Sequence, residues 1–256
     1  MTNNKDKVSQ WENKIAVVTG ASSGIGAAIV QDLARSKIKT IALARRLERM
    51  EGIKLSMPRD LQSYLNPMKC DVSNEEEVQK AFEQIITKYG GVDILVNNAG
   101  IFREGNLIAM DLKTIKKVVD TNLYGTIYCT KESFNSMQSR NVDGHIIIIN
   151  SIAGKQIPDG PESDNKSLNI YAPTKFALTA IADVYRHEFA QLGTKIKVTS
   201  ICPGLVDTEF LTEETLNSGK PMLTPEDVSN TVMYALNTPP HVQVSELTIQ
   251  PYGETN

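Results

Sequence analysis

The sequence predicts an α/β protein: a single Rossmann-like, doubly wound parallel sheet of about seven strands with helices on both faces. Apolar runs of strand length alternate with segments of helical periodicity along the 256 residues, a pattern typical of parallel sheets covered by helices. The runs after the first are continuously apolar, as expected for strands buried on both faces. Because no linker or repeat interrupts the pattern, we expect one domain over residues 1–256, with residues 1–12 as a flexible extension.

The elements follow one another in a regular order. "KIAVVTG" ends in glycine and predicts the first strand, and helical spacing begins at Gly24. Residues 74–89 place their apolar side chains on one face and acids in the first turn, which indicates an amphipathic helix. "TPEDV" at Thr224 has the residues of a helix start, with a capping threonine and proline at the first helical position. The remaining strands are expected within 39–44, 64–72, 92–100, 145–151, 196–204 and 242–250, and the remaining helices over 112–140 and 171–192.

Composition and charge exclude several classes of function. The net charge of -3 leaves no basic footprint for nucleic acid. No apolar run approaches the length of a membrane span, and the polar N-terminus lacks the apolar core of a secretory signal. The three cysteines are scattered and predict buried, reduced thiols in a cytoplasmic protein, while the three histidines lack metal-ligand spacing. We expect no metal site.

A glycine-rich turn, "GASSGIG", lies between the first strand and the first helix, with glycines at 20, 24 and 26. Glycines let a ligand approach the backbone closely, and a helix N-terminus offers free N–H groups and a positive dipole end. Glycine also forms ordinary turns, but this one has the strand-to-helix context that a dinucleotide site requires. We therefore expect the pyrophosphate of a dinucleotide here.

The end of the second strand indicates which dinucleotide binds. NAD sites usually place an acid there, whereas NADP sites place an arginine for the 2′-phosphate. This chain has Ala44 followed by Arg45 and Arg46, so we expect NADP rather than NAD, with Arg45 as the main ligand and Ser22 as a second. Alternatively, these arginines and Arg49 form a solvated helix start, although cations are mildly unfavourable at that end of a helix.

"NIYAPTK" places Tyr171 four residues before Lys175, so both side chains lie on one face of a helix. The pair can be an ordinary surface contact. It can also be a catalytic pair, because a nearby ammonium favours the phenolate and lowers the pKa of a tyrosine from its usual value near 10.

Together, "TGASSGIG", "NNAG", "SIAG" and "YAPTK" occur in the order in which they resemble the short-chain dehydrogenase/reductase family. The resemblance covers about residues 13–250 and implies a catalytic tetrad of Asn122, Ser151, Tyr171 and Lys175. It implies that Tyr171 exchanges a proton with the substrate oxygen, that Ser151 binds this oxygen, and that Asn122 holds a water connecting Lys175 to solvent.

The resemblance also implies the contacts of the cofactor. Asp71 would bond the adenine amino group beside Val72, residues 97–100 would lie against the adenosine ribose, and residues 203–208 would contact the carboxamide. The complete expected cofactor set is Gly20, Ser22, Ser23, Gly24, Ile25, Gly26, Arg45, Arg46, Asp71, Val72, Asn98, Ala99, Gly100, Tyr171, Lys175, Pro203, Gly204, Val206 and Thr208.

The stretches "QWENKIAVVTGASSGIGAA", "CDVSNEEEV", "RNVDGHIIIINSIAG" and "LNTPPHVQVSELTIQP" resemble, within the family, the NADP-dependent farnesol dehydrogenases and the related ketosteroid/carbonyl reductases. This implies interconversion of an apolar alcohol, such as a terpenoid, with its aldehyde or ketone. Apolar residues that can line the substrate pocket, or simply pack on the body of the protein, are Phe102, Ile157, Leu205, Phe210, Leu211 and Met222. A non-catalytic NADP-binding regulator is a further alternative, which the intact tetrad disfavours. The family implies a homodimer or homotetramer.

The segment between Ser151 and Tyr171 is longer than is usual in the family. Its polar part, "PDGPESDNKS" (residues 158–167), can be a surface insertion, which loops tolerate at little cost, or a rim over the substrate entrance.

Overall fold

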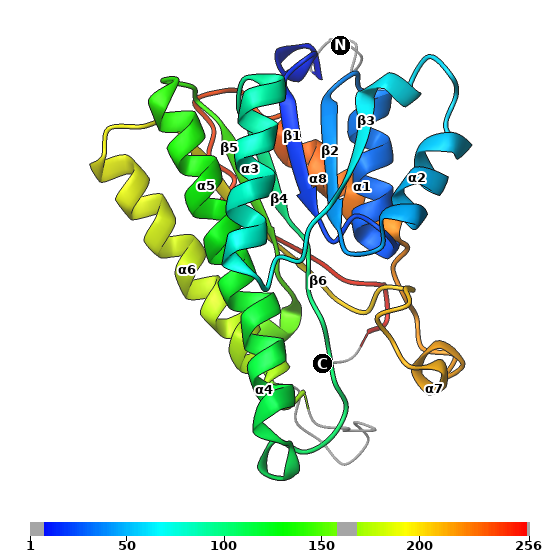
Figure 1. Cartoon of the computed structure of the whole chain (residues 1–256). Helices are drawn as coiled ribbons and strands as arrows, with labels where there is room; N and C mark the ends of the chain where they lie inside the picture. Colours follow the sequence, from blue (N-terminus) through cyan, green and yellow to red (C-terminus); the bar gives the residue numbers. More distant parts are fainter. Residues whose placement is uncertain (1–7, 158–167, 255–256) are drawn as a thin grey trace.

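A computed structural model describes residues 8–157 and 168–254 and confirms the predicted fold class. Seven parallel strands form one sheet in the order β3-β2-β1-β4-β5-β6-β7 (Figure 1). Each strand lies within a segment that the sequence predicts. The strands are β1 (Ile15–Thr19), β2 (Lys39–Ala44), β3 (Leu65–Lys69), β4 (Ile94–Asn97), β5 (His145–Ile149), β6 (Lys197–Pro203) and β7 (Glu246–Ile249).

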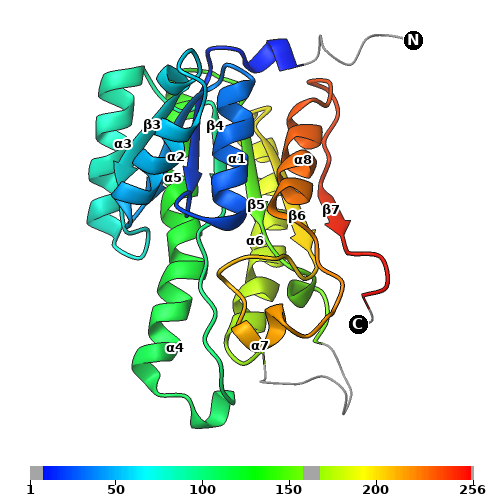
Figure 2. The ribbon, with the colours of Figure 1, turned by 90° about the vertical axis from the view of Figure 1, so that its right-hand side faces the viewer.

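Helices cover both faces of the sheet. One buried cluster packs α1, α2 and α8 against the sheet, and a second packs α3, α5 and α6 against the opposite face (Figure 2). The main helices are α1 (Gly24–Arg35), α2 (Leu47–Ser56), α3 (Glu75–Tyr89), α4 (Leu112–Val119), α5 (Gly125–Ser139), α6 (Tyr171–Gln191), α7 (Glu213–Leu216) and α8 (Pro225–Leu236). Thr224 and Asp227 form the capping box that starts α8.

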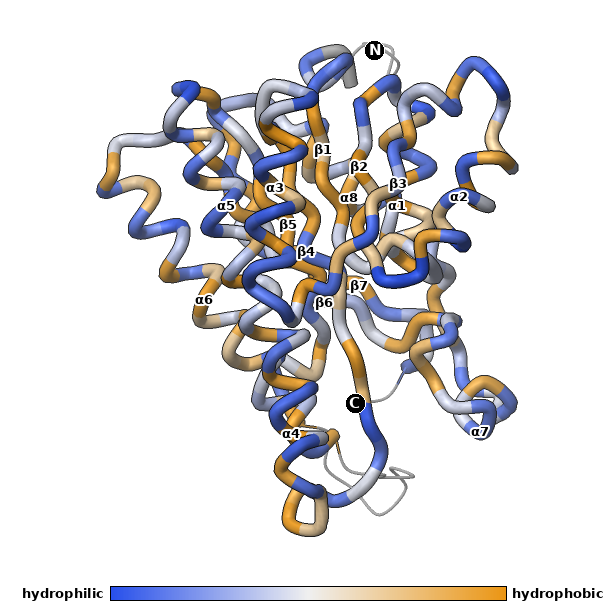
Figure 3. The backbone as a smooth tube through the Cα atoms, viewed as in Figure 1, coloured by the Kyte–Doolittle hydropathy of each residue, from blue (hydrophilic) through white to orange (hydrophobic). Residues whose placement is uncertain are grey.

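The core lies in the two layers between sheet and helices. β1, β4 and β5 are buried along their whole length, and the apolar colouring is concentrated on the strands and the inner helix faces (Figure 3). β3 is different: it contains Pro67, is only partly buried and pairs with β2 alone. Proline lacks a backbone N–H, so its place in an edge strand is expected.

The strand order places the candidate site. β1 pairs with β2 on one side and with β4 on the other, so the order reverses between β1 and β4. Ligands of such sheets bind beyond the carboxyl ends of the strands at this reversal. The loops after β1, β2, β4, β5 and β6 meet at this end of the molecule, where α4 and α7 also lie (Figures 1 and 2).

Two segments differ from the sequence-based expectation. The helix expected over 112–140 is divided into α4 and α5 by a π-helical turn, Asp120–Tyr124. The described part of the predicted N-terminal extension is anchored, because Trp11 is buried and its Nε1–H donates to the carbonyl of Leu236 at 2.8 Å. Apolar burial of the indole and this bond hold the chain against the C-terminal end of α8.

Two further observations concern features expected from composition. No helix within residues 8–157 and 168–254 is long and apolar enough to cross a membrane. The three cysteines, Cys70, Cys129 and Cys202, are free and buried, and burial raises the pKa of each thiol.

Candidate active site

The glycine-rich turn is held tightly against the end of β4. Gly20 and Gly24 have positive φ angles of 66° and 52°. A Cβ on Gly26 would lie 2.5 Å from both the Asn98 amide nitrogen and the Gly20 carbonyl oxygen, so only glycine fits there. Asn98 Nδ2 donates to the carbonyls of Thr19 and Gly20 at 2.9 and 3.2 Å. Asn98 therefore fixes the turn, a role distinct from the ribose contact that the resemblance implies.

The N-terminus of α1 has the features of an anion site. Ser23 is the N-cap residue in extended conformation, and within the described contacts its side chain makes no capping hydrogen bond. Its hydroxyl instead accepts from Arg46 Nη2 at 2.7 Å, and the hydroxyl of Ser22 accepts from Arg46 Nε at 3.1 Å. The first N–H groups of α1 face the turn with the positive end of the helix dipole, which suits a phosphate.

The two arginines after β2 point in different directions. Arg46 lies against the glycine-rich turn, as described above, whereas Nη1 of Arg45 lies 4.0 Å from the Asp71 carboxylate and its side chain is 56% exposed. We expected Arg45 to be the main phosphate ligand, but the geometry favours Arg46 because it already bonds both serines. The carboxylate of Asp71 accepts from the N–H and hydroxyl of Ser73.

Val72 is buried, whereas the loop after β4 is partly accessible. Val72 is 6% exposed and packs against the start of α5, where a Cβ on Gly125 would come within 2.9 Å of its side chain. Ala99 and Gly100 are half-buried beside the glycine-rich turn and Asn122.

Tyr171 and Ser151 come together at the carboxyl end of β5. Ser151 follows β5 and starts a short 3-10 turn (Ile152–Gly154), accepting from the N–H of Ala153 at 3.1 Å. Tyr171 is the first residue of α6, and the side chain of Ser151 lies close enough to its phenol to oppose the rise of the phenol pKa. Ser151 can therefore orient the phenol and share a bound oxygen atom with it.

Lys175 lies one turn further along α6 and is 6% exposed. Its Nζ donates to the carbonyl of Ile149 at 2.9 Å and lies 5.5 Å from the centre of the Tyr171 ring. Burial lowers the pKa of Lys175 to about 8. The pair is thus not a solvent-exposed surface contact.

The expected lowering of the Tyr171 pKa is wrong for this structure. Burial raises the pKa of Tyr171 to about 12, and the side chain of Ser151 acts in the opposite direction. Removing the phenol from water disfavours its charged form more than the neighbouring groups stabilise it. Tyr171 is accordingly a proton donor at neutral pH in this environment.

Asn122 lies in the π-helical turn and is buried. Its Oδ1 accepts from the N–H of Ile101 at 2.8 Å, and its Nδ2 donates to the Ile101 carbonyl at 3.0 Å and to Thr174 Oγ1 at 3.3 Å. The side chain therefore joins the loop after β4 to α6. With its side chain engaged, Asn122 would hold the expected water between Lys175 and solvent through its main-chain carbonyl. This carbonyl also accepts from the hydroxyl of Thr126 at 3.1 Å. π-Helical turns frequently mark functional positions.

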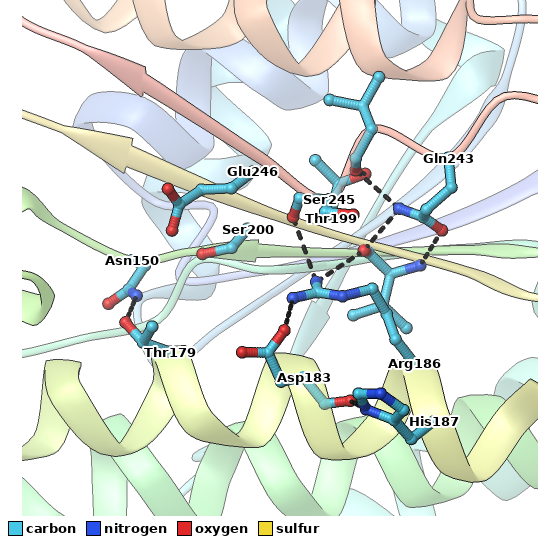
Figure 4. A network of polar contacts seen from close by, with 12 residues as sticks. Asn150, Thr179, Asp183, Arg186, His187, Thr199, Ser200, Gln243, Ser245 and Glu246 are labelled. Atoms are coloured by element: carbon cyan, nitrogen blue, oxygen red, sulfur yellow. Dashed lines mark hydrogen bonds and ion pairs between the residues drawn. The ribbon is translucent and has the colours of Figure 1, made fainter.

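A polar brace supports the loop that carries Ser151. Asn150 Nδ2 donates to Thr179 Oγ1 at 2.9 Å (Figure 4), and this hydroxyl donates to the carbonyl of Gly154 at 2.9 Å. A Cβ on Gly154 would lie 2.6 Å from the Lys175 carbonyl oxygen. These contacts fix the distance between the Ser151 loop and α6, and hence between Ser151, Tyr171 and Lys175.

Two of the six predicted substrate residues contact Tyr171. The ring centres of Phe102 and Phe210 lie 5.7 and 5.6 Å from that of Tyr171, and 6.3 Å from each other. Ile157 is 59% exposed. Leu205, Leu211 and Met222 are half-buried in the segment after β6. Residues 158–167 lie outside the described residues, so the predicted rim is not located.

The residues that we expect to contact the carboxamide lie at the end of β6 and just beyond it. Pro203 and Val206 are buried, and Thr208 lies against the glycine-rich turn, since a Cβ on Gly24 would come within 2.9 Å of its methyl group. Glu254, near the C-terminus, accepts from the N–H of Leu205 at 2.9 Å.

Sequence reasoning missed three groups of this site. Asn169, with a φ of 37°, donates to the carbonyls of Arg103 and Gly105 and so joins the loop after β4 to the start of α6. Glu209 pairs with arginines that follow β2, and Asn150 forms the brace described above. The asparagine after "IIII" adjoins Ser151, but no pattern in the sequence predicts the long-range partners of the three.

Taken together, these residues combine a proton donor, a second hydroxyl and a buried cation close to a turn suited to phosphate. Such a set can exchange a proton with a substrate oxygen while a dinucleotide lies along the strand ends. Within the described part of the chain, no three His, Cys, Asp or Glu side chains gather into a group that could hold a metal ion.

Comparison with known proteins gives consistent results. The family model described as short chain dehydrogenase matches residues 14–218. Farnesol dehydrogenase of Aedes aegypti is 48% identical over 248 residues, covering 96% of this chain and 99% of that protein. Dehydrogenase/reductase SDR family member 11 of Mus musculus is 36% identical, covering 95% of this chain and 96% of that protein.

Solved structures agree with this result. The closed form of serine dehydrogenase complexed with NADP+ superimposes with a TM-score of 0.82 at 31% identity, covering 94% of this chain and 98% of that one. Serine dehydrogenase from Escherichia coli superimposes with a TM-score of 0.78 at 30% identity, covering 94% of this chain and all of that one. The chain is an oxidoreductase of the short-chain dehydrogenase/reductase family.

Proposed function

We propose that the protein is an NADP(H)-dependent dehydrogenase that interconverts an apolar alcohol with its aldehyde or ketone. The observation that carries this proposal is the convergence of Ser151, Tyr171 and Lys175 at the carboxyl end of β5, beside the glycine-rich turn. A protein that only binds a dinucleotide needs no such set.

The residues of the chain have separable roles in this reaction. The bound nicotinamide cofactor supplies or accepts the hydride. Ser151 binds the substrate oxygen by a hydrogen bond and orients the phenol of Tyr171. Tyr171 donates its proton to this oxygen during carbonyl reduction and takes a proton from the hydroxyl during alcohol oxidation. The buried ammonium of Lys175 stabilises the phenolate that forms after proton donation.

The choice of NADP rests on Arg46. Its guanidinium lies beside Ser22 and Ser23 at the start of α1, and Ala44 occupies the position where NAD sites usually carry an acid. A planar guanidinium with two hydroxyls suits the oxygens of a 2′-phosphate. The structural relative that was solved with NADP+ supports this assignment.

The substrate class rests on the aromatic residues around Tyr171. Phe102 and Phe210 enclose the phenol with apolar surface, which favours a hydrocarbon group next to the reacting oxygen. The relative with 48% identity is a farnesol dehydrogenase, which supports a terpenoid alcohol such as farnesol.

Replacing Arg46 tests the choice of cofactor. We expect Arg46→Ala to weaken NADPH binding roughly tenfold, because one charge-assisted contact to the 2′-phosphate is lost. Binding of NADH, which lacks this phosphate, should change little. Fluorescence titration of both cofactors gives the dissociation constants, with Arg59→Ala as the control for loss of an exposed positive charge. Equal effects of Arg46→Ala on both cofactors would contradict the NADP assignment.

A further inference from the structure

Two arginines near the start of α1 share one carboxylate. Arg49 Nη1 lies 2.7 Å from both carboxylate oxygens of Glu209, and Arg46 Nη1 lies 3.1 Å from one of them. The remaining donors of Arg46 point at Ser22 and Ser23. The contacts of Glu209 lower the pKa of its carboxyl group, so it is ionised at neutral pH. The arginines thus already hold an anion.

Glu209 belongs to a segment that also reaches the substrate side of the site. The segment leaves β6 and returns at Leu223, whose N–H donates to the Leu205 carbonyl, while the N–H of Asp207 donates to the Leu223 carbonyl. Glu209 lies just beyond this pairing. The next residue, Phe210, contacts Tyr171. The arginine contact and the aromatic contact are therefore made by adjacent residues.

We propose that Glu209 occupies the place of the cofactor 2′-phosphate and is displaced when that phosphate binds. This inference rests on the proposed NADP dependence. A carboxylate and a phosphate dianion cannot both sit between Arg46 and Arg49 without strong repulsion, because like charges at contact distance disfavour each other. The guanidinium of Arg46, which pairs with Glu209, is the group that we assign to the phosphate, and Arg49 holds the same carboxylate beside it.

Displacement has two consequences. Glu209 competes with the 2′-phosphate and lowers the affinity for NADP(H) relative to a chain that lacks this carboxylate. It also couples the phosphate site to the substrate site, because Glu209 and Phe210 are adjacent and releasing Glu209 removes its arginine contacts from this part of the segment. Glu209 is therefore a specificity-determining residue, although it is not itself a ligand of the cofactor.

Binding of 2′,5′-ADP and 5′-ADP to wild type, Glu209→Gln and Glu213→Gln tests the competition by calorimetry. These probes differ at the phosphate in question and lack the nicotinamide. We expect Glu209→Gln to tighten 2′,5′-ADP binding about two- to fivefold, the range of an exposed ion pair, and to leave 5′-ADP unchanged. The gain should shrink at high salt. Glu213→Gln removes an exposed charge from the same segment and should alter neither affinity.

Hydrogen exchange of residues 208–218 tests the displacement itself. Adding 2′,5′-ADP should speed exchange in wild type, whereas in Glu209→Gln exchange should be fast without the probe and stay unchanged. Suppose that wild type binds 2′,5′-ADP more tightly than 5′-ADP. If Glu209→Gln then does not tighten 2′,5′-ADP binding, or if Glu209→Gln and Glu213→Gln tighten it equally, the competition is refuted and NADP dependence stands. If wild type binds both probes equally, the NADP proposal fails, and this inference with it.

Discussion

At the scale of single residues, the main feature is a lysine kept in the interior beside a tyrosine. Lys175 is 6% exposed and makes its hydrogen bond to the carbonyl of Ile149. Burial shifts the two groups in opposite directions, lowering the pKa of Lys175 to about 8 and raising that of Tyr171 to about 12. Both shifts favour the neutral forms, and their shared cause is loss of hydration.

The Lys175 shift predicts a pH-dependent stability. Because the folded-state pKa is about 8 against a usual 10.5, the unfolded chain binds more protons between these values, and stability rises with pH there. Lys175→Met removes this contribution. We expect the free energy of unfolding of wild type, measured relative to the variant, to increase by about 2 kcal/mol between pH 7 and pH 10.

Urea unfolding of both proteins at the two pH values gives this difference. Titration of Tyr171 lowers the free energy of unfolding above pH 10, because the pKa of Tyr171 is higher in the folded than in the unfolded chain. This effect is common to both proteins and largely cancels in their difference. A difference that does not change with pH would show that the ammonium is hydrated in the folded protein.

At the scale of elements, the site depends on how the loop after β5 is joined to α6. The hydroxyl of Thr179 accepts from Asn150 and donates to Gly154, and so connects the helix to both sides of Ser151. Asn122 and Asn169 join the loop after β4 to the same helix. The loops after β4 and β5 are therefore positioned by contacts with one helix and the residues just before it, and the first residue of this helix is Tyr171.

Thr179→Val tests this positioning. The substitution keeps the shape but removes the hydroxyl, leaving the Asn150 amide and the Gly154 carbonyl without this partner, so we expect a loss of about 1–3 kcal/mol of stability. We expect kcat to fall while the dissociation constant of NADPH stays unchanged, because the cofactor cradle is formed by other loops. Thr179→Ser should restore kcat.

Thr121→Val is the matched control. The hydroxyl of Thr121 donates to the carbonyl of Lys117 four residues earlier, so this bond stays within one helical stretch and joins no loop to α6. If Thr179→Val lowers stability without altering kcat, the brace is structural and does not position Ser151.

At the scale of the whole molecule, strand order explains why distant segments meet. Because all paired strands run parallel, the loops after five of them lie at one end of the sheet, and the order reverses there between β1 and β4. Trp11 and α8 belong to the same buried cluster as α1, on the face of the sheet where α1 begins at the glycine-rich turn. The N-terminal anchoring was not predictable from the polar sequence around it, because it depends on a carbonyl 225 residues away.

The fold could be predicted because its signals are local. Continuous apolar runs, a helical period, glycines at 20, 24 and 26 and the start signal at Thr224 each act over a few residues, and all agree with one architecture. The π-helical turn was missed because its residues continue the helical pattern of their neighbours.

The site was less predictable because its energetics depend on contacts between distant residues. The spacing of Tyr171 and Lys175 indicates proximity but not burial, so the direction of the Tyr171 pKa shift was wrong. The arginine pair was likewise visible, yet its orientation depends on Ser22, Ser23 and Glu209. No local pattern links Glu209 to β2.

The most direct test of the central claim is the turnover of Tyr171→Phe beside wild type. Initial rates with NADP and farnesol, and with NADPH and the corresponding aldehyde, would be measured together with the dissociation constant of NADPH. If Tyr171 supplies the proton, kcat falls about a hundred- to ten-thousandfold while NADPH binding is retained. A variant that keeps most of the wild-type rate would contradict the account, because the reaction would then not need the phenol.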